Sequence, residues 1–151
     1  MKNYIQVMAA VVVVVIMVVC TGEDICRKQI HTRNLALFIP ANFLLAWCSR
    51  NEWEMMAAGA VLGIIFLVIS ICTEEKIGKG DAVLIIGMGI DLGFWTALMV
   101  VFLALCAACI YGLILLRKRK GWSYEIAFIP FLLVPYISAV IRQLYYSNLA
   151  V

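Results

Sequence analysis

Long apolar runs separated by short polar stretches make up most of this sequence. The six runs cover roughly residues 4–20, 34–48, 54–72, 81–92, 94–116 and 126–141. A helix rises about 1.5 Å per residue and the hydrocarbon core of a bilayer is about 30 Å thick, so runs of this kind predict membrane-crossing helices. The pattern predicts an all-α, polytopic membrane protein with about six transmembrane helices in a single domain, residues 1–151.

The fourth and fifth runs are separated only by the stretch from Asp91 to Trp95, which contains Gly93. Taken as one helix, residues 81–116 would be about 54 Å long, which is too long for a single crossing. We therefore expect a break in this stretch. The fourth run then spans only about 18 Å, so either the bilayer thins locally or the helix begins inside the membrane boundary.

Small and aromatic residues add detail to this arrangement. Gly59 and Gly63 are four positions apart in the third run, a spacing that predicts close packing of another helix. Trp47 and Trp53 flank a short polar turn, as aromatic residues do at the interface between lipid and water.

The composition is that of a membrane protein and argues against a soluble or nucleic-acid-binding protein. Of 151 residues, 66% are hydrophobic and 14% charged, and the mean hydropathy is +1.04, more apolar surface than a soluble core of this size can bury. The net charge is only +3, and the basic residues form short clusters between the runs, which argues against nucleic-acid binding. The six cysteines are Cys20, Cys26, Cys48, Cys72, Cys106 and Cys109. Most of them lie in or beside apolar runs and are interpreted as small hydrophobic side chains, so we expect no metal site and no cofactor.

The basic residues also predict an orientation, because loops of a six-helix protein alternate between the two sides of the membrane. Positive charge accumulates in cytoplasmic loops. One side collects Arg27, Lys28, Arg33, Lys76, Lys79, Arg117, Lys118, Arg119 and Lys120, and the other receives Lys2, Arg50 and Arg142. The first side is therefore predicted to be cytoplasmic, with both chain termini outside.

Two aspartates fall on that cytoplasmic side at helix ends. Asp24 follows the first run, and Asp81 opens the fourth after the turn Gly78-Lys79-Gly80. Two such carboxylates could activate a water between them, one accepting its proton and the other, protonated, polarising a scissile carbonyl. Like charges this close cannot both ionise easily, so the pair would share one proton. Helix dipoles weakly favour Asp81 as the base and Asp24 as the acid.

Other interpretations of the acidic residues stay open. Asp24 and Asp81 could instead be solvated charges that cap helices. Asp91 falls on the opposite side, where a capping or interfacial role is expected. Glu74 and Glu75 precede the Gly78 turn and are candidates for binding a basic substrate segment rather than for catalysis.

At this point the chain resembles the prepilin peptidases, membrane aspartic proteases that share a Gly-x-Gly-Asp motif with presenilin-like proteases. Residues 78–81 match that motif fully. The family places Ile six residues after its first aspartate, in an Ile-Pro-Asn element. Asp24 and Ile30 keep that spacing, while His31 and Thr32 replace the Pro and Asn.

Two further segments are similar to the family. Residues 89–95 resemble its small-residue, Gly-Trp helix ending, and residues 127–132 its Pro-Phe-Gly-Pro-Phe-Leu element, with Ala127 and Ile129 departing. Val83 stands where the family often has Lys. The resemblance covers nearly the whole chain and implies catalysis by Asp24 and Asp81.

The resemblance also implies a substrate and a place in the cell. Larger members of the family carry a cytoplasmic insert and also methylate the mature pilin. This chain has no room for that insert, so the resemblance implies a peptidase without a methyltransferase domain. Its partner would be a prepilin or pseudopilin, cut after a short basic leader at the cytoplasmic face of the inner membrane. An intramembrane aspartic protease with a non-pilin substrate, and a non-enzymatic transporter or assembly subunit whose carboxylates relay protons, are the alternatives. The oligomeric state is left open.

Overall fold

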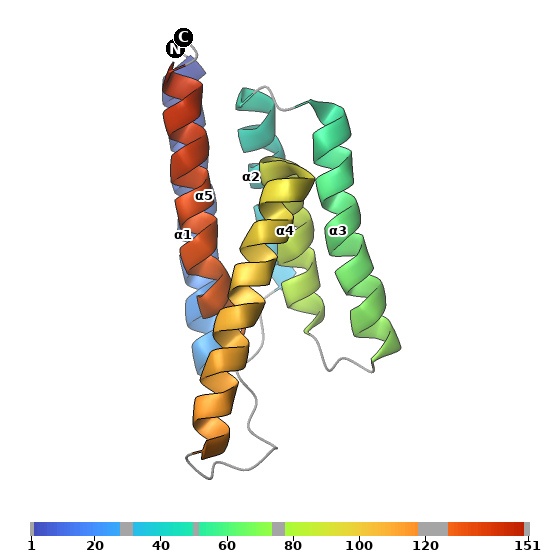
Figure 1. Cartoon of the computed structure of the whole chain (residues 1–151). Helices are drawn as coiled ribbons and strands as arrows, with labels where there is room; N and C mark the ends of the chain where they lie inside the picture. Colours follow the sequence, from blue (N-terminus) through green and yellow to red (C-terminus); the bar gives the residue numbers. More distant parts are fainter. Residues whose placement is uncertain (1, 28–31, 50–51, 74–77, 118–126, 150–151) are drawn as a thin grey trace.

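Every regular element of the protein is a helix within the residues that the computed structural model describes, which are 2–27, 32–49, 52–73, 78–117 and 127–149. In chain order the helices are α1 (Lys2–Arg27), α2 (Thr32–Cys48), α3 (Trp53–Cys72), α4 (Lys79–Arg117) and α5 (Ile129–Leu149) (Figure 1). No strand occurs in these ranges. The predicted all-α class is confirmed.

Helix α4 consists of two limbs that meet at Gly93. This residue has φ 73° and ψ 170°, a conformation that is accessible almost only to glycine. The first limb, residues 79–92, and the second, residues 94–117, run in opposite directions along the bundle (Figure 1). The predicted break is therefore present, and Gly93 supplies its backbone geometry.

Among the described residues, four helices are long and apolar enough to cross a membrane. They contain the candidate spans Tyr4–Cys26, Trp53–Cys72, Lys79–Leu115 and Ile129–Tyr146. Helix α2 is apolar but shorter, with 17 residues, and the two limbs of α4 fall within one span. The predicted multi-pass membrane character is supported, whereas the predicted number of six crossings is not confirmed.

The end of α1 corrects one sequence-based prediction. The apolar pattern predicts that the first helix ends near Cys20, with a polar loop from Gly22 onward, but α1 continues to Arg27. The hydroxyl of Thr21 donates a hydrogen bond to the carbonyl of Met17 at 2.8 Å, which satisfies this polar side chain within the helix. A single Gly22 costs the helix only about 1 kcal/mol relative to Ala, too little to end it. Asp24 therefore lies within the last turn of α1 rather than in a loop.

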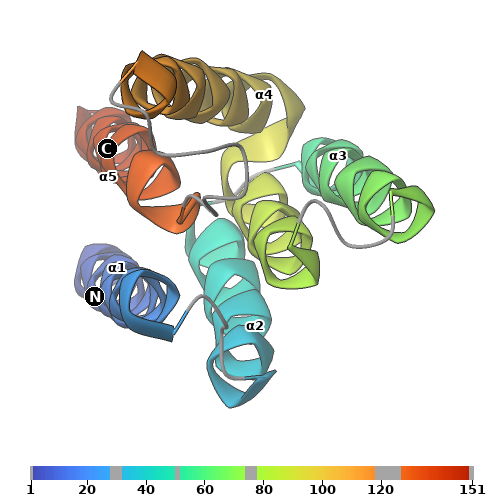
Figure 2. The same cartoon turned by 90° about the horizontal axis from the view of Figure 1, so that it is seen from below.

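Helix α3 packs against the first limb of α4 through glycines (Figure 2). A Cβ atom at Gly59 would overlap the carbonyl of Gly89, and one at Gly63 would overlap the backbone of Ile86. The two backbones are thus in direct contact, as small residues allow in membrane helices. This confirms the close packing predicted from the spacing of Gly59 and Gly63.

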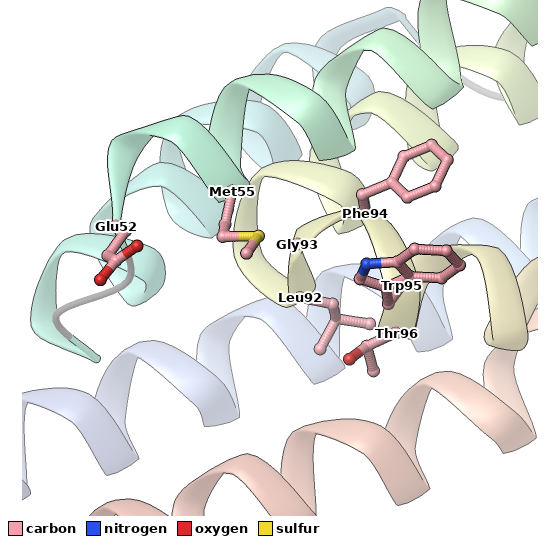
Figure 3. Close-up of a pocket in the computed structure, with 7 residues that line it drawn as sticks. All are labelled: Glu52, Met55, Leu92, Gly93, Phe94, Trp95 and Thr96. Atoms are coloured by element: carbon pink, nitrogen blue, oxygen red, sulfur yellow. The ribbon is translucent and has the colours of Figure 1, made fainter.

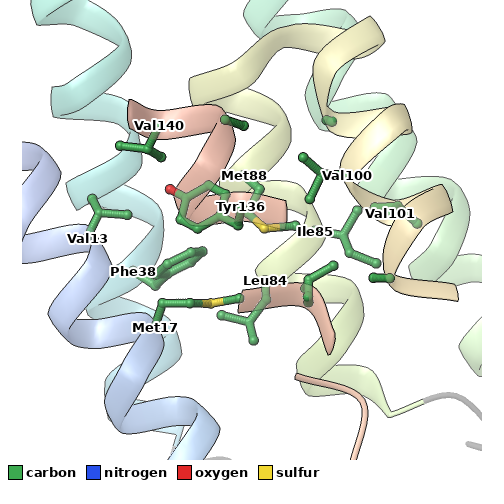
Figure 4. Packing of buried hydrophobic residues seen from close by; sticks show 14 of the residues in the cluster. Val13, Met17, Phe38, Leu84, Ile85, Met88, Val100, Val101, Tyr136 and Val140 are labelled. Carbon is green, nitrogen blue, oxygen red and sulfur yellow. The ribbon is translucent and has the colours of Figure 1, made fainter. Parts of the chain in front are cut away.

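A single apolar core joins the helices. Its fully buried members include Met17 of α1, Phe38 of α2, Leu84 and Met88 of α4, and Tyr136 of α5 (Figure 4). Large apolar side chains such as those of α1's valine run also cover much of the outer surface. An apolar exterior around a packed core is the distribution expected of a protein whose solvent is lipid.

Candidate active site

Three helix ends meet toward one end of the bundle. They are the C-terminal end of α1 and the N-terminal ends of α4 and α5 (Figures 1 and 2). Asp24 lies in the last turn of α1, and Asp81 lies in the first turn of α4. Residues far apart in the sequence therefore contribute to one site.

Asp24 is buried and held in place by α5. Its side chain is 9% exposed, and its Oδ2 atom accepts a hydrogen bond of 3.1 Å from the backbone N–H of Ile129. Ile129 is the first residue of α5, where backbone N–H groups have no partner within the helix. The carboxylate of α1 thus satisfies a donor of α5 and fixes one helix end against the other.

Asp81 is half-buried at the start of α4. Its backbone N–H donates to the carbonyl of Gly78 at 3.0 Å, which closes the first turn. A Cβ atom at Gly78 would lie 3.1 Å from Oδ2 of Asp81, so a side chain at this position would crowd the carboxylate. Gly78 therefore leaves one side of Asp81 open, and Gly80 lies between them in the same turn.

The structure places Asp24 and Asp81 within electrostatic reach of each other. Their carboxylates are close enough for the charge of Asp24 to act on Asp81. Two like charges that repel in a partly buried setting bind one proton between them more readily than none. One carboxylate and one carboxylic acid that face the same reacting group can respectively accept and donate a proton, which is what acid-base hydrolysis requires.

Of the other candidate residues, Asp91 is among those that the structure describes. Glu74, Glu75 and His31 fall outside the described residues. Asp91 lies at the opposite end of the first limb of α4 and is fully buried. The Nε2 atom of Gln143 donates to Oδ1 of Asp91 at 3.2 Å. The expected capping or interfacial role of Asp91 stays a prediction, and the structure adds that α5 provides it with a polar partner inside the bundle.

Sequence reasoning missed the polar contacts that α5 makes. Besides the bonds to Asp24 and Asp91, the hydroxyl of Tyr136 donates to Oδ1 of Asn42 at 2.8 Å, with both side chains fully buried. The Nδ2 atom of Asn42 in turn donates to the carbonyl of Phe38 at 2.8 Å. Asn42, in the middle of the apolar run 34–48, was the available signal, because a polar side chain inside such a run needs an internal partner.

A shallow pocket lies at the turn around Gly93, away from the two aspartates. Its lining includes Glu52, Met55 and Trp95, with a volume of about 210 Å³ (Figure 3). Glu52 is its one acidic residue, so it offers no pair of carboxylates. Among the described residues, no group of three or more His, Cys, Asp or Glu side chains could hold a metal ion.

Comparison with known proteins gives one match. The model of the type IV leader peptidase family matches residues 11–113, a range that includes both Asp24 and Asp81. No curated protein matches the chain. No solved structure matches it either.

Proposed function

Because the chain belongs to the type IV leader peptidase family, we propose that it is an aspartic endopeptidase that removes the short basic leader of prepilin or pseudopilin precursors. The observation that carries the proposal is that the buried Asp24 and the half-buried Asp81 lie close enough for the charge of one to act on the other. The family supports a peptidase, and the paired carboxylates support the aspartic type.

The proposed reaction uses the two carboxyl groups as a unit. The ionised carboxylate accepts a proton from water as the water oxygen attacks the carbonyl carbon of the scissile peptide bond. The protonated carboxyl donates a hydrogen bond to the carbonyl oxygen and stabilises the tetrahedral intermediate. As this intermediate collapses, the C–N bond breaks and the proton taken from water passes to the leaving nitrogen.

The helix-dipole argument from the sequence, which favoured Asp81 as the base and Asp24 as the acid, is weakened by the position of Asp24. That choice assumed that Asp24 only follows the C-terminal end of α1. Asp24 also accepts the N–H of Ile129 at the N-terminal end of α5, so the two helix ends act on it in opposite senses. The two residues are therefore proposed as one proton-sharing pair without separate assignment.

The proposed setting is the cytoplasmic face of the inner membrane. If α2 and each limb of α4 cross the bilayer, the chain makes six crossings, and the predicted distribution of basic residues places the aspartates on the cytoplasmic side. A prepilin would present a basic leader there, ahead of an apolar helix that packs against this protein in lipid. Glu74 and Glu75 are proposed to attract that leader by their charge.

Co-expression with a prepilin tests the proposal, with leader removal followed as a mobility shift on a gel. Asp24→Asn and Asp81→Asn should each lower the cleavage rate by about 10²–10⁴-fold, because each removes a proton-transferring group. Glu54→Gln, which removes an exposed carboxylate from the first turn of α3, is the matched control and should cleave at the parent rate. Normal processing by either aspartate variant at equal membrane abundance would remove that residue from the chemistry.

A second arm tests the substrate. The purified enzyme is given the prepilin and, separately, an unrelated membrane helix with a basic N-terminal flank. We expect cleavage of the prepilin alone. Comparable cleavage of both would leave the aspartic chemistry standing and reject the leader specificity.

A further inference from the structure

Helix α5 donates three hydrogen bonds to three other helices, at positions spaced by seven residues. The donors are a backbone N–H at the start of the helix and two side chains further along it. They are Ile129 to Asp24 of α1, Tyr136 to Asn42 of α2, and Gln143 to Asp91 of α4.

Spacing by seven places these residues on one face of α5. Seven residues at about 100° each return to within about 20° of the starting direction, and 14 residues rise about 21 Å. The side chains of Tyr136 and Gln143 on this face meet α2 in the middle of the bundle and the end of the first limb of α4 at the other end, while the N–H of Ile129 at the start of the helix meets α1. Tyr136 sits within the apolar cluster between them (Figure 4).

These contacts define the position of α5 along its axis more sharply than apolar packing does. Asn42, Tyr136 and Asp91 are all fully buried. Sliding α5 by one residue would separate each donor from its acceptor by about 1.5 Å along the axis, and unpaired polar groups in an apolar setting cost about 1–3 kcal/mol each. The three bonds thus oppose a shift in register.

The position of α5 along its axis affects the separation of Asp24 and Asp81, because α5 is hydrogen-bonded to both of the helices that carry them. Through Ile129 it holds Asp24 directly. Through Gln143 it holds Asp91, which lies on the same helical limb as Asp81, about 15 Å further along. A rigid limb transmits the position of one end to the other.

We propose that α5 is the positioning element of the active site, in which Gln143 and the N–H of Ile129 together set the separation of Asp24 and Asp81. Gln143 and Asp91 are positioning residues that act through the limb, and neither contacts the reacting atoms. The catalytic meaning of this role rests on the proposed peptidase function, whereas the geometric part does not.

Kinetics of purified variants test the Gln143 contact. Gln143→Leu keeps the size of the side chain and removes the donor. The kcat should fall about ten- to a hundredfold, because small misplacement of catalytic groups is costly, while KM changes little. Asp91→Leu should behave in the same way, and Asp91→Asn, which keeps the Oδ1 acceptor, should recover most of the rate. Tyr145→Leu, an exposed neighbour on α5, is the control and should match the parent.

Cross-linking tests the geometry without using activity. Cysteines replace Asp24 and Asp81 in a chain whose six native cysteines are changed to alanine, and a short bifunctional thiol reagent joins them. Because Asp24→Cys removes the acceptor of the Ile129 N–H, this assay reports on the Gln143 contact alone. Adding Gln143→Leu should lower the cross-linked yield severalfold, whereas Tyr145→Leu should leave it unchanged. An unchanged yield with Gln143→Leu, or a loss of rate that only tracks the folded fraction, would overturn the proposal. Full activity of Asp24→Asn would instead reject the peptidase chemistry and leave the cross-linking result valid.

The Ile129 contact has its own matched pair. Ile129→Pro removes the N–H, and proline suits the first position of a helix. Ile129→Ala keeps the N–H and removes most of the buried side chain. If the N–H positions Asp24, the Pro variant should be at least about tenfold slower than the Ala variant. Equal rates would show that only side-chain packing matters at this position.

Discussion

The backbone contact between α3 and the first limb of α4 predicts that Gly59→Ala is strongly destabilising. A Cβ atom at Gly59 would overlap the carbonyl group of Gly89 and lie 3.0 Å from its Cα atom. Both obstacles are backbone, so no side chain can rotate away to make room. The two helices must therefore separate to accept a single methyl group.

The size of the effect follows from the distance by which the methyl group forces the helices apart. Carbon atoms are in optimal contact at about 3.5–4.0 Å, so the helices must separate by at least about 0.5–1 Å. A gap of that width weakens the dispersion attraction between facing atoms by about a quarter to a half along the interface. Overpacking of this kind typically costs about 1–3 kcal/mol, and we expect Gly59→Ala to fall in the upper half of that range.

Gly22→Ala is the matched control for this prediction. A Cβ atom at Gly22 has no neighbour within 4 Å, and replacing an internal helical glycine by alanine removes a propensity cost of about 0.5–1 kcal/mol. Unfolding of both variants in the same detergent, followed by circular dichroism, should show Gly59→Ala less stable than the parent and Gly22→Ala equal or more stable. Equal stability of the two variants would refute the inference that the α3–α4 backbones touch.

Three further predictions follow from single residues. Gly93→Ala should destabilise the fold by about 1–3 kcal/mol in the same unfolding assay, because φ 73° with ψ 170° strains any residue that has a side chain. A Cβ atom at Gly93 would have ordinary contact with Cβ of Met55 at 3.6 Å, so the cost comes from the backbone conformation. A cost near zero would mean that the turn relaxes. Tyr136→Phe should cost about 0.6–2 kcal/mol by leaving Oδ1 of Asn42 without this donor, and a fully neutral result would show that another group replaces it. Maleimide should label the exposed Cys26 of the folded protein in detergent but not the buried Cys20, and equal labelling measured by mass spectrometry would contradict the packing of α1.

The fold class, the break at Gly93 and the glycine contact were predictable because each depends on local pattern. Apolar runs need lipid or a core, a helix much longer than a bilayer must bend, and glycines spaced by four allow helices to touch. The end of α1 was not predictable from the polar residues after Gly22. Asp24 in this stretch has its partner at the start of α5, and such a partner is a property of tertiary structure.

The candidate site was predictable in part for the same reason. Asp24 and Asp81 were singled out by chemistry and by a motif, and in the structure the charge of Asp24 reaches Asp81, while their catalytic role stays a prediction. The contacts that hold them were not visible in the sequence, because Ile129 contributes through its backbone and Gln143 lies in a polar stretch near the C-terminal end of α5. A backbone donor has no signature in the side-chain pattern.

The hydrogen bond between Ile129 and Asp24 joins residues that are 105 positions apart. At a synthesis rate of about 5–20 residues per second, the carboxylate of α1 leaves the ribosome on the order of 5–20 s before the amide that secures it. A nascent chain is thus expected to have an incomplete candidate active site until α5 has entered the membrane, and under the proposed function hydrolysis by a newly made chain begins only after its insertion is finished.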